Sequence, residues 1–312
     1  MSPLEPTRSS LPNPLLRYFL ATRPAFLSVT AVGVLIGWAS ASAGGAHVAL
    51  FPALLTMAFA LVAHAGANVV NDYYDGLSGC DDANAERVYP FTGGSRFIQN
   101  GVLTPSEVKA FGYGLLAVVI PPGLWLTIHS GPGLLAIGVV GLAAGWAYSA
   151  PPLKLQSRGL GEFAITAGWT LIVIGSDYVQ RGTFDFLPLA AGLGFALLVA
   201  NVLYINQFPD IRADALAGKR TVVVRLGAGA SRWGYALIAG SAYVWPIAMV
   251  FAGRLPPIAL LSILAAAASF AALRILWTEA AHPQALAPAL KLTIVAALAH
   301  GLTMAATIAF KL

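Results

Sequence analysis

Residues 48–75 read VALFPALLTMAFALVAHAGANVVNDYYD, a mostly apolar run that ends in asparagine and aspartate. A run of about 20 apolar residues is long enough to cross the hydrocarbon core of a bilayer as a helix. Backbone groups inside that core must be hydrogen-bonded within the segment, so a helix is the structure we expect. We therefore predict a membrane-spanning helix that carries carboxylates at one edge of the membrane.

The composition of the whole chain also indicates a membrane protein. Of the 312 residues, 58% are hydrophobic and only 10% are charged, and the mean hydropathy is +0.75. Soluble domains carry about 25% charged residues, so this chain has too few to cover a soluble surface. The net charge of +5 could indicate nucleic-acid binding. In a membrane chain, however, Lys and Arg residues typically mark the cytoplasmic loops, and we favour that interpretation.

The predicted fold class is all-α, a polytopic bundle of nine transmembrane helices with a cytoplasmic N-terminus. The nine apolar blocks are 25–42, 48–70, 109–128, 132–149, 163–179, 186–206, 232–252, 256–276 and 288–310. This topology places every Lys and Arg in a cytoplasmic segment except Arg181, Arg254 and Lys311, which agrees with the positive-inside rule. No linker or low-complexity segment divides the chain, so we expect residues 1–312 to form a single domain.

The first polar cluster follows the second apolar block. Asn68, Asp72 and Asp75 are spaced i, i+4 and i+7, which puts them on one face of a helix. Asp81 and Asp82 follow shortly after. Carboxylates that lie close together repel one another unless a cation neutralises them. Magnesium suits this cluster, because it takes oxygen ligands and is commonly shared with substrate phosphates.

The second cluster follows the sixth apolar block, four blocks after the one that precedes the first cluster. A duplication of one four-helix unit within the chain would produce this spacing. Asn206, Asp210 and Asp214 again share one helical face. Pro209 removes a backbone donor and can kink the helix just before Asp210, which would turn Asn206 away from the aspartates. Cations suited to phosphate oxygens follow at Lys219, Arg220 and Arg225.

These motifs resemble those of a known family. The segments that carry the resemblance are Arg23-Pro24, 71–81 (NDYYDGLSGCD), 92–96 (TGGSR), 148–154 (YSAPPLK), 206–214 (NQFPDIRAD) and 217–227 (AGKRTVVVRLG). Together the chain resembles the UbiA superfamily of intramembrane prenyltransferases, and within it the MenA branch, the 1,4-dihydroxy-2-naphthoate polyprenyltransferases of menaquinone synthesis. The six-residue gap from Asp75 to Asp81 is typical of that branch.

The resemblance implies a central cavity capped by the two aspartate clusters, and it assigns roles to individual residues. One Mg²⁺ would be held by Asp72, Asp75 and Asp81, and another by Asp210 and Asp214; Asp72 could also help as a base. The diphosphate-binding residues would be Asn71, Arg96 and Lys154, together with Arg23, Lys219 and Arg220. Two features depart from the family pattern: Phe208-Pro209 replaces the usual polar pair, and Asp82 beside Asp81 leaves two candidates for one ligand.

The implied reaction is transfer of a polyprenyl chain from its diphosphate to an aromatic quinol precursor, most simply 1,4-dihydroxy-2-naphthoate. We expect a multi-pass protein of the cytoplasmic (inner) membrane whose site faces the cytoplasm, with Mg²⁺ as cofactor, no nucleic acid and no obligate protein partner. The alternatives are another acceptor such as 4-hydroxybenzoate, cyclisation of the prenyl diphosphate without an acceptor, and a secondary transporter. A transporter would place its charges near the bilayer midplane, whereas these aspartates are predicted at one membrane edge.

Three further side chains are left without a functional role. His64 lies one turn before Asn68, and we interpret it as a packing or hydrogen-bonding residue. Trp169 and Tyr178 could contact the acceptor or the isoprenoid tail, but no pattern in the sequence assigns either of them this role.

Overall fold

The protein is described here from a computed structural model, which covers residues 5–310. Lys311 and the two ends of the predicted single domain lie outside the described residues. Within this range the regular elements are all helical. They are α1 (Pro14–Ala21), η1 (Pro24–Phe26), α2 (Leu27–Ala43), α3 (Leu50–Leu77), α4 (Cys80–Ala83), α5 (Pro105–Val118), α6 (Ile120–Ser130), α7 (Gly133–Ala147), η2 (Leu155–Arg158), α8 (Gly161–Arg181), α9 (Leu187–Leu216), α10 (Val222–Phe251), η3 (Pro257–Ala265), α11 (Ala266–Glu279), η4 (Pro283–Leu286) and α12 (Ala287–Ala309).

Each of the nine apolar blocks coincides with helical structure, but three blocks are divided, the first of them at 25–42 into the end of η1 and α2. The block at 109–128 forms α5 and α6, which adjoin at Val119 just before Pro121 and Pro122. Proline cannot donate the helical hydrogen bond, which accounts for a break at this point. The block at 256–276 forms η3 followed by α11.

Seven helical segments within residues 5–310 are long and apolar enough to cross a membrane. They do not include α7, which has only 15 residues, or α8, which carries Glu162, Asp177 and Arg181. The all-helical membrane architecture is therefore clear, whereas the nine spans and the cytoplasmic N-terminus remain predictions.

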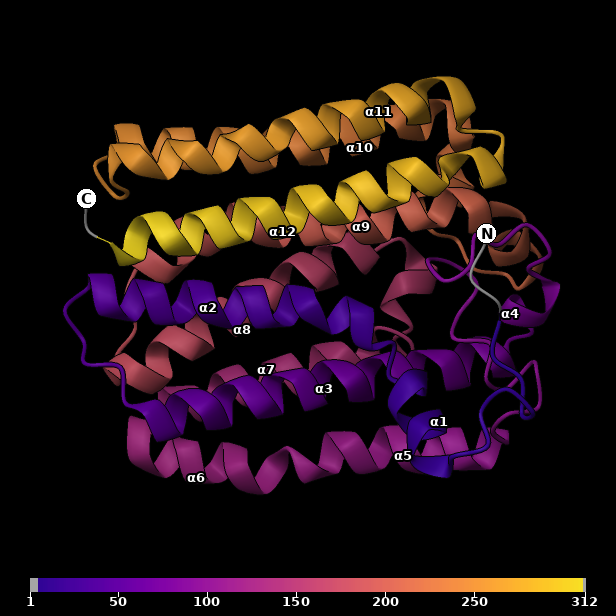
Figure 1. The fold of residues 1–312 in the computed structure, drawn as a ribbon, viewed down its shortest axis with the longest axis horizontal. Coiled ribbons are helices and arrows are strands. Elements are labelled where there is room, and N and C mark those ends of the chain that lie inside the picture. The colour runs from indigo at the N-terminus through magenta and orange to yellow at the C-terminus, as the bar shows by residue number, and fades with distance from the viewer. Residues whose placement is uncertain (1–4, 311–312) are drawn as a thin grey trace.

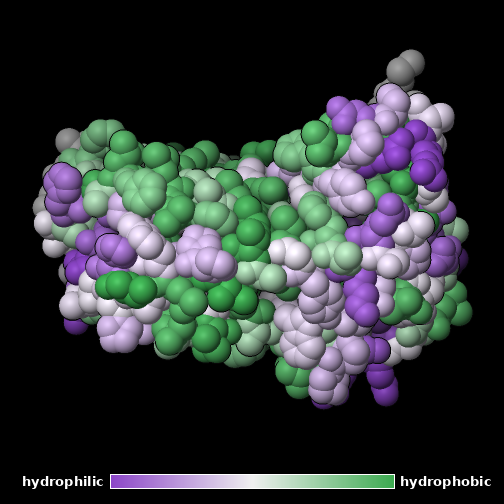
Figure 2. Space-filling model, turned by 90° about the horizontal axis from the view of Figure 1, so that it is seen from below, coloured by the Kyte–Doolittle hydropathy of each residue, from purple (hydrophilic) through white to green (hydrophobic). Residues whose placement is uncertain are grey.

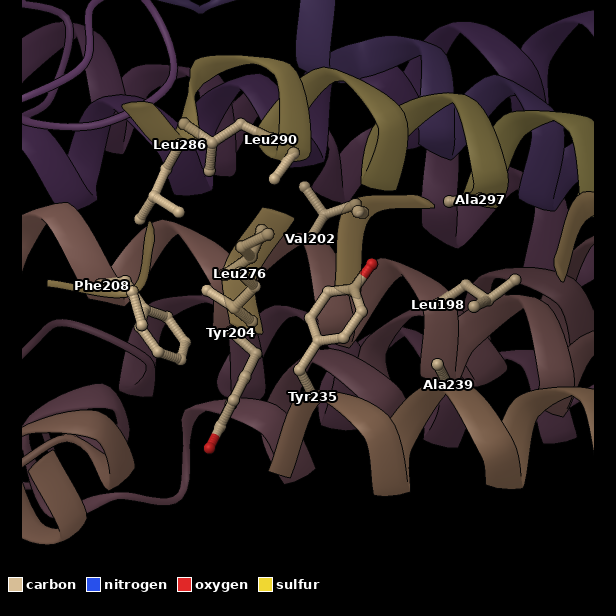
Figure 3. Packing of buried hydrophobic residues seen from close by; sticks show 14 of the residues in the cluster. Leu198, Val202, Tyr204, Phe208, Tyr235, Ala239, Leu276, Leu286, Leu290 and Ala297 are labelled. Carbon is tan, nitrogen blue, oxygen red and sulfur yellow. The ribbon is translucent and has the colours of Figure 1, made fainter. Parts of the chain in front are cut away.

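The long helices lie side by side with their axes nearly parallel, and α4 and the N-terminal segment lie at one end of the bundle (Figure 1). We call this the aspartate end. Helix α9 is central, because it packs against α2, α8, α10 and α12. A tight core joins α9 to α10, α11 and α12, where Tyr204, Phe208, Tyr235, Leu276 and Leu290 interdigitate (Figure 3).

The face of the molecule seen in Figure 2 is mostly hydrophobic in its middle and more polar at its two ends. Large apolar side chains point outward from the long helices, with Ile128 81% exposed, Leu237 72% exposed and Phe251 86% exposed. A soluble protein would bury such side chains, but in a bilayer they contact lipid tails.

Helices α2 and α8 approach each other closely at Gly37. A Cβ atom placed on Gly37 would lie 2.5 Å from the Cβ of Ser176 and 2.5 Å from the carbonyl oxygen of Val173. The small residue therefore permits a contact between two helices that line the central cavity described below.

We predict that Gly37→Ala lowers the stability of the protein, because the added methyl group must push α2 and α8 apart. Overpacking of this kind costs about 1–3 kcal/mol. Gly240→Ala in α10 is the matched control, since its added Cβ would have no atom of the described chain within 4 Å apart from the neighbouring backbone of its own helix. Thermal unfolding in detergent should show a lower midpoint for Gly37→Ala, and an unchanged or higher midpoint for Gly240→Ala. A Gly37→Ala protein as stable as wild type would contradict the close helix contact.

Candidate active site

A cavity of about 1490 Å³ runs through the bundle. Its walls come from α2, α3, α6, α7, α8 and α9, and most of the lining side chains are apolar. At the aspartate end the cavity is lined by residues of α4, of the loop at 89–97 and of the N-terminal segment, residues 5–11. A chamber that is apolar along most of its length and ionic at one end suits a ligand with a long apolar chain and a charged head.

The end of α3 brings the first cluster to this cavity. Asp75 lines the cavity, where its Oδ1 accepts from Gln156 at 3.1 Å and its Oδ2 accepts from Asn71 at 3.1 Å. Asp72 is buried behind it and forms an ion pair with Arg23. Arg23 itself lines the cavity. The helical spacing thus brings both carboxylates to the aspartate end, where Asp75 lines the cavity and Asp72 does not.

The turn after α3 distinguishes Asp81 from Asp82. Gly79 adopts φ +74°, a left-handed conformation that lets the chain reverse into α4. Asp81 then points inward, lines the cavity and is only 4% exposed, whereas Asp82 is exposed to solvent. Burial, followed by repulsion from Asp75 and Asp72, raises the pKa of Asp81 well above its usual range. This geometry favours Asp81 over Asp82 as the metal ligand.

The second cluster reaches the same cavity from α9. The helix continues past Pro209 to Leu216, and Asn206, Asp210 and Asp214 all line the cavity. Asp210 accepts from Asn84 at 2.6 Å, and Asp214 accepts from the thiol of Cys80 at 3.1 Å. The proline therefore does not separate Asn206 from the two aspartates.

One lysine joins the two clusters. The ammonium group of Lys219 lies 2.8 Å from Asp75 Oδ1 and 3.4 Å from Asp214 Oδ1. Lys219 is 7% exposed. Burial alone would lower its pKa, but attraction by Asp75 and Asp214 outweighs burial and raises the pKa of Lys219 well above the usual value. Carboxylates that are far apart in the sequence therefore share one charged neighbour.

The other predicted cations lie at different depths. Arg96 is buried behind Asp81 and donates to the Asp81 carbonyl oxygen, so its side chain does not line the cavity. Lys154 lines a smaller pocket of about 100 Å³ beside Asp75, which shares Gln156 and Lys219 with the large cavity. Arg220 is exposed to solvent and lines neither the large cavity nor the smaller pocket. Arg23 and Lys219 are thus the predicted cations at the cavity itself.

Comparison with known proteins agrees with this architecture. The model of the UbiA prenyltransferase family matches residues 29–299. The chain belongs to the UbiA prenyltransferase family. It is 33% identical over 215 residues to the 1,4-dihydroxy-2-naphthoate octaprenyltransferase of Mycobacterium tuberculosis, covering 68% of this chain and 70% of the relative.

Solved UbiA structures share the fold across nearly the whole chain. Digeranylgeranylglyceryl phosphate synthase superposes with a TM-score of 0.65 at 19% identity, covering 96% of this chain and 99% of that structure. A UbiA homologue from Archaeoglobus fulgidus, bound to GPP and Mg²⁺, superposes with a TM-score of 0.58 at 14% identity, covering 93% of this chain and 99% of that one. At such identities the likeness shows the fold alone.

The residues of this UbiA chain fit a divalent cation in charge and in ligand type. Five buried or cavity-lining carboxylates meet here, and two cations, Arg23 and Lys219, contact them. Asp81 Oδ2 is buried without a hydrogen-bond partner in residues 5–310. Gly94, with φ +72°, leaves open the space beside this oxygen, which a Cβ atom would fill.

The carboxylates do not form a complete metal-binding site on their own. No three Asp, Glu, His or Cys side chains of the described residues are arranged so that they could hold a metal together. Magnesium, however, is usually bound by one or two carboxylates plus substrate phosphates and water. The arrangement therefore fits an ion that arrives with a diphosphate.

Sequence reasoning missed the side chains that hold the carboxylates. Asn84 donates to Asp210, and Gln156 donates to Asp75 and to Ser149. Asn84 follows the four-residue α4 and Gln156 lies in the four-residue η2, and elements this short have no apolar periodicity that could have pointed to them. Gln156 follows soon after the segment 148–154 that carries part of the family resemblance, which was the one available indication.

We predict that Asp81→Asn and Asp82→Asn have very different effects on prenyl transfer. Loss of a group that orients a metal ligand costs about 10–100-fold in activity, and loss of a ligand should cost at least as much. Asp81→Asn should therefore reduce kcat/KM by about 100-fold or more, while Asp82→Asn stays within about twofold of wild type. Steady-state kinetics in detergent, at equal amounts of folded protein, measures both. The reverse ranking would show that the exposed aspartate is the functional one.

Proposed function

We propose that this chain is a magnesium-dependent prenyltransferase that moves a polyprenyl chain from its diphosphate to 1,4-dihydroxy-2-naphthoate. The observation that carries the proposal is the position of Lys219, whose ammonium group contacts carboxylates of both aspartate clusters. A diphosphate bound beside Lys219 would lie within reach of both clusters at once.

The chain's own residues supply binding and orientation of the diphosphate. Asp75, Asp81, Asp210 and Asp214 face the cavity and are the proposed ligands of Mg²⁺, which when bound would neutralise the leaving diphosphate. Asp72 is held by Arg23 in this structure. In our proposal Asp72 joins the ligands when Arg23 turns toward the diphosphate. Lys219 and Arg23 would then stabilise the negative charge that develops as the allylic C–O bond breaks.

The apolar part of the cavity serves the other half of the reaction. It lies directly next to the aspartates and is lined mainly by alanine, leucine, isoleucine and valine side chains. Such walls exclude water, so an allylic carbon that becomes electron-poor is attacked by the aromatic acceptor and not by water. The volume of about 1490 Å³ leaves room for a long prenyl chain beside an aromatic ring.

The proposed acceptor is taken from the name of a similar protein, because the geometry of the cavity does not identify the acceptor. The similar protein of M. tuberculosis is a 1,4-dihydroxy-2-naphthoate octaprenyltransferase. The gap between Asp75 and Asp81 supports the same branch. The positive-inside pattern supports a site at the cytoplasmic edge of the cell membrane, with nine spans, because Lys and Arg concentrate in the loops at the aspartate end.

We predict that purified protein prenylates 1,4-dihydroxy-2-naphthoate when given a long polyprenyl diphosphate and Mg²⁺. Excess EDTA should remove activity to background, and added Mg²⁺ should restore it, because the carboxylates repel the diphosphate without the ion. A panel that includes 4-hydroxybenzoate and an acceptor-free reaction, analysed by mass spectrometry, tests the acceptor.

Turnover of 4-hydroxybenzoate alone would move the chain to another branch of the same family. Release of a cyclised prenyl product without an acceptor would overturn the transfer reaction. Activity that persists in EDTA would overturn the role assigned to the metal.

A further inference from the structure

Two polar side chains in the apolar part of the cavity have hydrogen-bonding atoms that nothing in the fold uses. Trp169 projects from α8 and Asn206 from α9, and both line the cavity. Trp169 Nε1 and Asn206 Oδ1 are buried and find no partner among residues 5–310. A buried polar atom without a partner lowers stability, so such atoms call for an explanation.

Most other polar side chains of the same cavity are satisfied by the protein itself. Asn68 donates to the carbonyl oxygen of Thr22 at 3.0 Å. Thr127 and Ser176 donate to carbonyl oxygens one turn earlier in their own helices, at 2.9 Å and 2.7 Å.

Three other lining residues also have an unpaired buried atom, namely Arg23, Asp81 and Asn84, but they belong to the charged cluster at the aspartate end. Trp169 and Asn206 are the lining residues beyond that cluster whose unpaired atoms remain to be explained.

Both groups lie beyond the aspartates, toward the apolar interior. Asn206 is one helical turn from Asp210, which corresponds to about 6 Å along α9. Trp169 packs its ring edge-on against His64, with ring centroids 5.0 Å apart. His64 is seven residues from Asn71, about 10 Å along α3, and its Nδ1 is fixed to Thr30 Oγ1 at 2.9 Å.

The two substrates of a prenyl transfer differ in what they can offer these atoms. A prenyl chain has no hydrogen-bonding atoms, so it would leave the Trp169 donor and the Asn206 acceptor unpaired. An aromatic acid with ring hydroxyl groups carries both an acceptor oxygen and a donor hydrogen. The position of Asn206, one turn from Asp210, also suits an aromatic acceptor. If the diphosphate binds at the aspartates, the acceptor ring must lie close to them to reach the first carbon of the prenyl chain.

We propose that Trp169 and Asn206 form the acceptor subsite, which takes a hydroxylated aromatic acid. The indole N–H of Trp169 donates to an oxygen of the acceptor, and Asn206 Oδ1 accepts from a ring hydroxyl. His64, held by Thr30, fixes the plane of the indole ring. This inference rests on the proposed prenyl transfer and adds the residues that select its second substrate.

The test compares Trp169→Phe and Asn206→Leu with two matched controls. Trp38→Phe and Asn201→Leu remove the same kinds of unpaired atom outside the cavity lining, since Trp38 Nε1 and Asn201 Oδ1 are also buried without a partner in the part of the chain described. Equilibrium binding of 1,4-dihydroxy-2-naphthoate to protein in lipid nanodiscs needs no prenyl diphosphate and no turnover. Thermal unfolding confirms that each variant is folded.

Each cavity variant should raise the Kd and the KM of the acceptor by about 5- to 20-fold, the effect of one lost hydrogen bond. The KM for the prenyl diphosphate should stay within about twofold, and both controls should bind the acceptor like wild type. The methyl ether of the acceptor, which has no ring hydroxyl to donate, should bind wild type weakly and should lose no further affinity in Asn206→Leu.

Unchanged acceptor affinity in both cavity variants would overturn the subsite, as would an equal rise in the KM for the prenyl diphosphate. Failure of wild type to bind any hydroxylated aromatic acid would overturn it as well. Failure of the proposed function is a separate result. If wild type binds the acid through Trp169 and Asn206 but forms no prenylated product, the subsite stands and the transfer reaction does not.

Discussion

The site depends on mutual repulsion among carboxylates that are buried or line the cavity. Asp72, Asp75, Asp81, Asp210 and Asp214 meet at one end of an apolar chamber, where burial from water strengthens the repulsion. Arg23 and Lys219 offset part of this charge, and the rest calls for cations that arrive from outside. A substrate that brings divalent ions together with its own phosphates meets that requirement.

The rest of the fold holds these charges in place. Helices α3 and α9 run the length of the bundle and carry the two clusters at the same end. Asn84 and Gln156 fix individual carboxylate oxygens, and Gly94 keeps the space beside Asp81 open. Behind this charged end lies the apolar part of the cavity. In our proposal the charged end binds the diphosphate and the apolar part keeps water from the reacting carbons.

The sequence predicted those parts of the structure that follow from periodicity. Apolar block length located all the long helices. The i, i+3 spacing of Asp72 and Asp75 and the i, i+4 spacing of Asp210 and Asp214 placed each pair on one side of its helix. The family recognised from the motifs is confirmed, together with the enzyme class. The individual site roles, the nine spans and the orientation remain predictions.

What the sequence could not give depends on three-dimensional detail. A single left-handed residue, Gly79, decides that Asp81 and not Asp82 faces the cavity, and adjacent aspartates look alike in a sequence. The family resemblance made Arg96 a diphosphate-binding residue, and only the structure shows that its guanidinium donates to the backbone carbonyl of Asp81 and that its side chain does not line the cavity. Trp169 carried no motif at all, since its unpaired N–H becomes visible only when its surroundings are known.

The central claim is that two clusters hold one diphosphate through divalent ions, and binding of an unreactive prenyl diphosphate analogue tests it most directly. Titration calorimetry with Mg²⁺ would compare wild type, Asp75→Asn, Asp210→Asn and the double variant. Two clusters that hold one ligand should be strongly coupled, so the double variant should lose little more affinity than either single variant. One analogue should bind per chain, and only with Mg²⁺. Losses that simply add, or binding without the metal, would contradict the account.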